Sequence, residues 1–251
     1  MLKLYARLAG KSIRLAVRGW PAAVVLPIYA TALMIAIGQA EQQGIAGRFL
    51  VSFAAAFLIS SYLHLVYLAV AGRKIGLGDF RDSFMAHFWD VVSVMFATWV
   101  IQLAVGVLTR DMGDRGTIIF ILVDLTMVVF FNPVPELIYL GQGRVRSFGL
   151  LMEAGRFVSA HWPEWLAPSA LMAAVVLAPS GLLRHGPAAE KLLMVQQLFS
   201  LQGLSQAVLR FPLWLAPFLL LFITWGMVFR GLLFSELTSR VRRPRPVSRW
   251  P

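Results

Sequence analysis

The chain has no cysteine and is poor in charge, since Asp, Glu, Lys and Arg make up only 14% of its 251 residues. Without a thiol it has no disulfide, zinc–thiolate site, iron–sulfur cluster or cysteine nucleophile. Soluble domains carry roughly a quarter charged residues, so a soluble globular fold and a disordered chain both fit poorly. Hydrophobic residues make up 59%, and 18 Phe and 8 Trp suit lipid and its interfaces. The composition predicts a polytopic helical membrane protein.

Motifs for catalysis and metal binding are also missing. The four histidines show no H-E-x-x-H spacing, and the sequence has no G-x-S-x-G elbow, P-loop or multi-aspartate run. We therefore expect no catalytic residue, no metal and no cofactor, and we expect that the protein is not an enzyme. The formal net charge of +11 comes from basic residues that flank apolar runs, so we expect no nucleic acid partner.

Apolar runs divide the chain into six expected membrane spans. Each run is close to the roughly 20 residues that a helix needs to cross the hydrocarbon core. The runs cover about 19–38, 49–71, 89–108, 117–140, 165–183 and 211–229. We expect one all-α membrane domain over 1–251, with a basic amphipathic arm at 1–18 and a basic tail at 230–251.

The placement of basic residues predicts the orientation of these spans. Sixteen of the 23 Lys and Arg fall on the side of the two termini, and six fall on the other side. Because Lys and Arg accumulate on the cytoplasmic side, both termini are expected there. Arg outnumbers Lys nineteen to four, which is typical of a GC-rich bacterial genome and indicates a bacterial plasma (inner) membrane.

Three segments of the chain resemble one another when they are stacked. Each has a short amphipathic stretch, then a tryptophan, then an apolar run, and the tryptophans are Trp20, Trp89 and Trp162. One interpretation is a threefold repeat of an interfacial helix followed by a membrane hairpin. The other is that any six-helix protein places Trp at its membrane boundaries. The sequence leaves both open.

Three segments outside the expected spans are amphipathic. On a helix the basic residues of the arm fall within about 80° of arc, which suits contact with anionic lipid or serves only as a topology signal. These residues are Lys3, Arg7, Lys11, Arg14 and Arg18. Residues 79–88 carry a stripe of Phe80, Phe84 and Phe88, which suits membrane contact or docking to a partner. Residues 188–209 form an unusually apolar outer loop.

Acidic residues inside the expected fourth span are the best candidates for a functional site, because charge in a membrane is costly. Asp124 is interpreted either as a buried polar contact or as part of a translocation path. Glu136 follows Asn132, Pro133 and Pro135, and the two prolines must break the helical hydrogen-bond ladder. The break could gate a pathway or bind a cation. The favoured alternative is that Glu136 pairs with an Arg from another unit and holds the bundle together.

The layout resembles the membrane subunit of an ABC-2-type transporter. That resemblance implies six spans with both ends cytoplasmic, a basic N-terminal helix, a coupling helix at 79–88 and outer helices at 188–209. The repeated texture, including F-R-D-S-F-M-A-H-F-W, is also similar to bacterial six-span membrane domains of the glycerophosphodiester phosphodiesterase membrane-domain type. Neither resemblance supplies catalytic residues.

The sequence predicts one function and leaves an alternative, and the positions of the helices outside the spans favour the first. The first is a permease subunit, energised by a separate ATP-binding protein. The second is a non-catalytic scaffold or lipid-binding subunit of a membrane complex. Both imply the lipid bilayer and other protein subunits as partners, and both are compatible with a homo-oligomer.

Overall fold

A computed structural model describes residues 2–40, 44–141, 148–177 and 216–242 of the chain. Every regular element in these ranges is an α-helix, so the expected all-α class is confirmed for the described part. The helices are α1 (Leu2–Arg18), α2 (Trp20–Ala40), α3 (Gly44–Val70), α4 (Leu77–Ala86), α5 (Phe88–Thr109), α6 (Gly113–Phe130), α7 (Val134–Leu140), α8 (Phe148–Leu177) and α11 (Ala216–Arg242).

Five stretches of the described chain are helical, long enough and apolar enough to cross a membrane. They are Trp20–Ala40, Phe49–Val70, Phe88–Thr109, Gly113–Leu140 and Leu220–Ser239. The first four coincide with the first four expected runs. The run expected at 165–183 passes beyond the described residues after 177, and the outer segment 188–209 lies wholly outside them. The run expected at 211–229 also begins outside, and the candidate span on α11 starts at Leu220.

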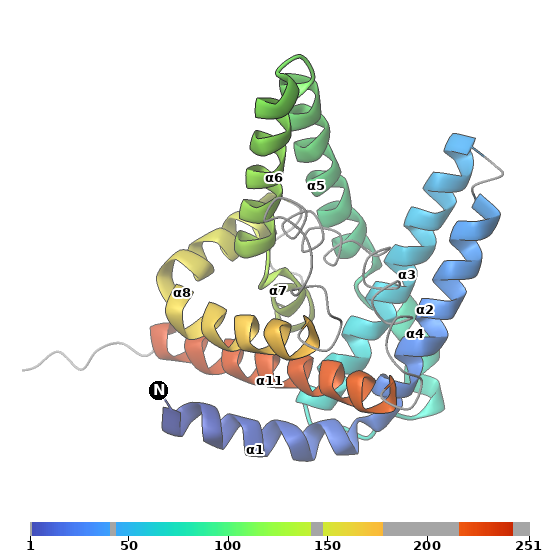
Figure 1. The fold of residues 1–251 in the computed structure, drawn as a ribbon. Helices are drawn as coiled ribbons and strands as arrows, with labels where there is room; N and C mark the ends of the chain where they lie inside the picture. Colours follow the sequence, from blue (N-terminus) through green and yellow to red (C-terminus); the bar gives the residue numbers. More distant parts are fainter. Residues whose placement is uncertain (1, 41–43, 142–147, 178–215, 243–251) are drawn as a thin grey trace, which may run out of the picture.

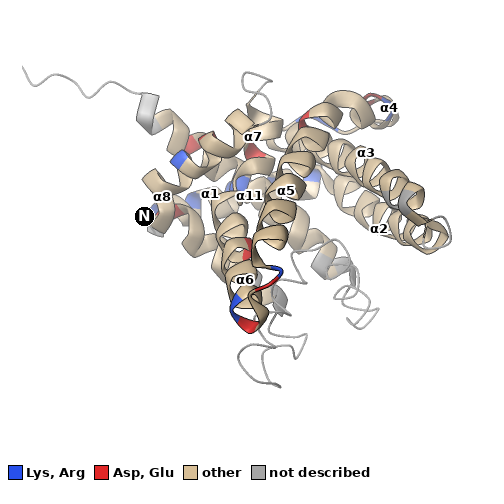
Figure 2. Ribbon diagram, turned by 90° about the horizontal axis from the view of Figure 1, so that it is seen from above, with Lys and Arg blue, Asp and Glu red and all other residues tan. Residues whose placement is uncertain are grey.

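Helices α2 and α3 form one hairpin, and α5 and α6 form another; both rise from a base of α1, α8 and α11 (Figure 1). Charged residues gather at the α5–α6 turn and around α4, whereas α2 and α3 are uncharged over most of their length (Figure 2). Apolar side chains such as Ile28, Phe96 and Leu103 are exposed on the hairpins. Exposed apolar surface of this extent suits contact with lipid.

The same succession of amphipathic helix, bend and exposed tryptophan occurs three times. The bends fall at Gly19, at His87 (φ −130°) and at His161 (φ −131°), one or two residues before Trp20, Trp89 and Trp162. These tryptophans are 57%, 66% and 62% exposed. At the first bend a side chain is excluded, because a Cβ on Gly19 would lie 2.7 Å from the Cβ of Ala69.

We name the three segments unit 1 (α1–α3), unit 2 (α4–α7) and unit 3 (α8 and α11). The amphipathic helix that begins each unit packs on the last helix of another unit: α4 on α3, α8 on α7 and α1 on α11. The last helices α3, α7 and α11 also contact one another, and most of the core lies at their junction. The described units therefore form a closed ring, in which α1, α2 and α3 of the first unit all contact α11 of the last.

Candidate functional site

The candidate site lies where the fourth span is interrupted. Helix α6 ends at Phe130, and α7 begins at Val134 after Phe131, Asn132 and Pro133. Proline has no backbone N–H and its ring crowds the preceding turn, so Pro133 and Pro135 cannot extend the ladder of α6. The chain recovers a regular pattern when the N–H of Leu137 donates to the Pro133 carbonyl at 3.0 Å.

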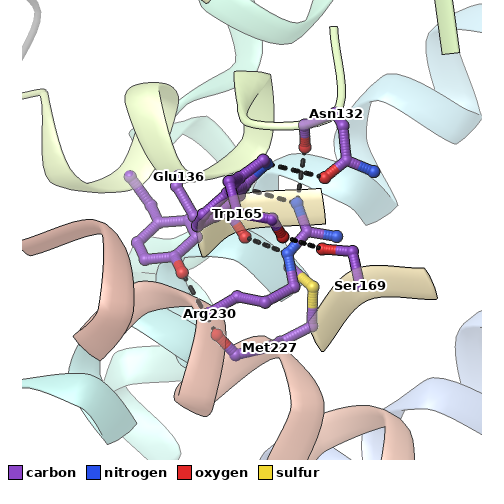
Figure 3. A network of polar contacts seen from close by, with 7 residues as sticks. Asn132, Glu136, Trp165, Ser169, Met227 and Arg230 are labelled. Atoms are coloured by element: carbon purple, nitrogen blue, oxygen red, sulfur yellow. Dashed lines mark hydrogen bonds and ion pairs between the residues drawn. The ribbon is translucent and has the colours of Figure 1, made fainter. Parts of the chain in front are cut away.

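Glu136 sits in the first turn of α7, and its side chain is fully buried. Arg230 of α11 meets it through two contacts: Nε lies 2.9 Å from Oε1, and Nη2 donates to Oε2 at 3.0 Å (Figure 3). The Nη2–Oε2 contact is a charge-assisted hydrogen bond, whereas Nε and Oε1 are close enough for an ion pair but form no hydrogen bond. The pair joins unit 2 to unit 3 across 94 positions of sequence.

The interruption itself supplies further partners for Arg230. Its Nη2 also donates to the main-chain oxygen of Asn132, which the break leaves without a helical donor (Figure 3). The guanidinium lies 5.0 Å from the ring centroid of Trp165, within the range of a cation–π contact. The indole Nε1 of Trp165 donates to Oδ1 of Asn132 at 2.9 Å, so α8 is tied to the same point.

Close approach of α7 and α11 depends on Gly231. The hydroxyl of Tyr139 donates to the Met227 carbonyl at 3.3 Å, and Tyr139 is buried. A Cβ on Gly231 would lie 2.5 Å from the Tyr139 hydroxyl and 3.0 Å from Val70. Glycine therefore lets the tyrosine lie flat against α11, beside Arg230.

The chemical capacity of this site is to lock helices together. Both carboxylate oxygens of Glu136 face Arg230, and the carbonyl freed by the break is already occupied. In the described ranges no group of three or more His, Asp or Glu side chains is placed to hold a metal ion. We call Asn132, Glu136, Trp165 and Arg230 the polar latch.

Asp124, grouped with Glu136 in the sequence analysis, has different partners. It is buried on α6, and Gln102 of α5 donates to its Oδ1 at 3.4 Å. This contact lies within the α5–α6 hairpin, whereas the polar latch joins different units. Whether Asp124 serves a translocation path stays a prediction.

The phenylalanine stripe turns toward the chain's own helices. Phe88 is buried and stacks on Phe57, with ring centroids 4.2 Å apart, which leaves little of it for a partner. Phe80 packs against a cluster of α2 and α3 side chains, and Phe84 lies 6.1 Å from the Tyr29 ring. Docking to a partner through these residues stays a prediction that the geometry does not favour.

Buried hydroxyl groups join α4 to the first hairpin. The hydroxyls of Ser61 and Ser83 hydrogen-bond to each other, and the Tyr29 hydroxyl bonds to Ser61. The backbone N–H of His87, at the second bend, donates to Ser60 at 3.0 Å. Burial, together with the neighbouring His64, lowers the pKa of His87 to about 4, so this imidazole is neutral at physiological pH.

Five basic residues of α1 form an exposed basic face, as the arm's spacing predicts. They are Lys3, Arg7, Lys11, Arg14 and Arg18. Sequence reasoning did not identify Trp165, Gln102 or Arg230 as site residues, and it placed position 230 at the start of the basic tail. A lone Arg inside an apolar run is itself a signal of a buried partner.

Comparison with known proteins adds no identification. No protein-family model matches the chain, and no curated protein or solved structure matches it.

Proposed function

We propose that the chain is a six-span protein of a bacterial inner membrane, with both termini in the cytoplasm and three related units. Support comes from the five described candidate spans, the basic residues near both termini and the recurring bend before an exposed tryptophan. The sixth span would begin in the second half of α8, after the bend at His161. A protein with this topology places the polar latch inside the bilayer.

We further propose that it acts as a non-catalytic scaffold subunit of a membrane assembly. The observation that carries this proposal is the closed polar latch, in which Glu136 and the free carbonyl of the break are both taken up by Arg230. Buried charges in membranes mark transport pathways when they face a cavity, and they hold helices when they face each other. Here the ionic groups at the break face each other.

A permease subunit energised by a separate ATP-binding protein is the second candidate. It is favoured by the interruption between α6 and α7, because many transporters place such breaks at the bilayer midplane. The buried contact between Asp124 and Gln102 supplies a second polar group in the same hairpin. In this case Asp124 would belong to the path.

One experiment separates the two candidates. The tagged protein is isolated in mild detergent from its native host, its partners are identified by mass spectrometry, and ATPase activity is assayed on the eluate. The variant Asp124→Asn is compared with Thr126→Val, which changes an exposed residue two positions away on α6.

The abundance of the partner membrane proteins is also measured in a strain that lacks the gene. If the protein is a scaffold, these partners become less abundant in that strain, and expression of either variant restores their abundance. Recovery of a stoichiometric ATP-binding subunit would overturn the scaffold proposal. A change in its ATPase activity with Asp124→Asn, but not with Thr126→Val, would establish the permease.

A further inference from the structure

Helix α1 lies at the junction of units 1 and 3, where α2 and α3 also contact α11. Leu4, Leu8, Ser12 and Ala16 recur at four-residue spacing and are buried, and α1 contacts α11 of unit 3 and α3 of unit 1. In Figure 1, α1 runs beside α11 along one end of the molecule. The tight packing of Gly19 on Ala69 fixes one end of α1 to unit 1. The remainder of α1 must be held to unit 3 by its own contacts.

Two polar contacts join α1 to unit 3. The Tyr5 hydroxyl donates to the Glu164 carbonyl at 3.0 Å, and Arg7 pairs with Glu236 at 3.5 Å. The Arg7 side chain is largely exposed in this pair, and exposed ion pairs add little stability because water and salt screen them. The attachment of α1 to unit 3 therefore rests mainly on the buried residues of α1, and anything that binds its exposed side adds to it.

The exposed side of α1 carries charge that the described residues do not balance. Among those residues, Arg7 is the one member of the basic face with an ion pair, although all five side chains crowd one side of the helix. Like charges three or four positions apart repel one another. The repulsion is relieved when an external anion neutralises the face.

An exposed apolar stripe borders this basic face. Ile13 and Val17 are more than half exposed, and Trp20 follows them at the start of the first candidate span. A helix whose open surface is half cationic and half apolar is suited to lie in the headgroup region, with its apolar stripe toward the acyl chains. Because the span begins two residues after α1 ends, α1 is held at the membrane surface.

We infer that α1 is a lipid-dependent clasp: anionic phospholipid headgroups bind the basic face and hold α1 against α11 at the junction of unit 1 and unit 3. The occupant is a lipid because the apolar stripe lies beside the cations, and a soluble phosphate has no acyl chain to cover it. This inference is independent of whether the protein is a scaffold or a permease.

The absence of cysteine allows a direct test by paired spin labels. Gly10→Cys on α1 has open space around its Cβ, and Ser159→Cys on α8 is exposed, so the pair reports the separation of units 1 and 3. The doubly labelled full chain is reconstituted in phosphatidylcholine nanodiscs with or without phosphatidylglycerol. Distances are measured by double electron–electron resonance.

We expect one narrow distance distribution with phosphatidylglycerol, and loss of that narrow peak in phosphatidylcholine alone or at high salt. Replacing the five basic residues by Gln should abolish the response, whereas Arg110→Gln with Arg115→Gln, at the α5–α6 tip, should preserve it. The lipid comparison needs no charge variant, so it remains decisive if the Gln variant fails to insert.

Identical distributions in the two lipids would overturn the clasp. Recovery of the narrow peak in phosphatidylcholine by soluble glycerol phosphate would overturn the assignment of a lipid as occupant. Loss of the response in the Arg110 and Arg115 variant would show a general effect of charge rather than a site on α1.

Discussion

The polar latch makes a specific prediction about stability. The substitution Glu136→Gln keeps the size of the side chain but removes its charge, which leaves Arg230 buried beside a neutral amide. The Arg230 side chain is only 16% exposed, so water cannot replace the lost carboxylate. Removing one member of a buried ion pair costs about 3–5 kcal/mol. For a chain of this length that loss lowers Tm by roughly 10 °C.

The double variant Glu136→Gln with Arg230→Met tests the reasoning behind this number. It removes both charges and fills the space of the arginine with an apolar side chain of similar length. Replacing both members of a buried pair is often close to neutral, so the double variant should be more stable than Glu136→Gln alone. The two positions should therefore be strongly coupled in a double-mutant cycle.

Stability is measured on the purified protein in one detergent, by thermal unfolding and by titration with a denaturing detergent. Glu236→Gln is the matched control, because it removes a carboxylate from a partly exposed ion pair and should change stability by less than about 1 kcal/mol. Wild-type stability of Glu136→Gln would refute the latch. The latch would also be refuted if the loss of stability in the double variant equalled the sum of the losses in the two single variants.

Three further predictions concern packing, pH and depth in the membrane. Gly231→Ala should destabilise the protein by about 1–3 kcal/mol, because its Cβ meets the buried Tyr139 hydroxyl, whereas Gly10→Ala should not; thermal unfolding measures both. The pKa of His87 is 6.5 in the unfolded chain and about 4 in the folded protein, so the free energy of unfolding should decrease as pH falls from about 6.5 toward 4. The variant His87→Gln should flatten this dependence of stability on pH, and a flat dependence in the wild type would contradict the prediction. Spin labels are placed at the three exposed tryptophans, which are Trp20, Trp89 and Trp162. Power saturation should report one shared depth in the membrane for these labels and a greater depth for a label at Trp99. Three different depths would contradict a common interface.

Features that depend on local chemistry could be predicted from the sequence. The lengths of the apolar runs predicted the first four spans, and the two prolines predicted the break before α7. The exposed basic face of α1 follows from residue spacing alone, because a helix fixes which side chains share a side. A recurring local pattern also identified three tryptophans, because each follows a short amphipathic stretch. They are Trp20, Trp89 and Trp162.

Features that depend on which helices meet could not be predicted. Spacing predicts Phe80, Phe84 and Phe88 on one face of a single helix, but the bend at His87 ends α4 and places Phe88 at the start of α5. The surroundings of Phe80 and Phe84 are then decided by the helices that α4 packs against. Likewise the sequence indicates that Glu136 needs a cation, yet its partner lies 94 positions away on another unit. Trp165 is an ordinary apolar residue in the sequence, and its indole becomes a latch donor only after α8 reaches Asn132.

The contacts between units explain how three similar segments can assemble in one order. Units 1 and 2 are joined by buried hydroxyls, including Ser61 and Ser83. Units 2 and 3 are joined by the buried pair of Glu136 and Arg230, and units 3 and 1 by a surface ion pair and by the packing of α1, α2 and α3 on α11. If units were exchanged, Glu136 or Arg230 would be buried against hydroxyls or apolar side chains, and an unpaired buried charge is severely destabilising. Buried polar groups are best attested as determinants of register among similar helices, and here they discriminate among similar interfaces. Because an unpaired buried charge is so costly, the Glu136–Arg230 pair favours the observed order of units in the ring.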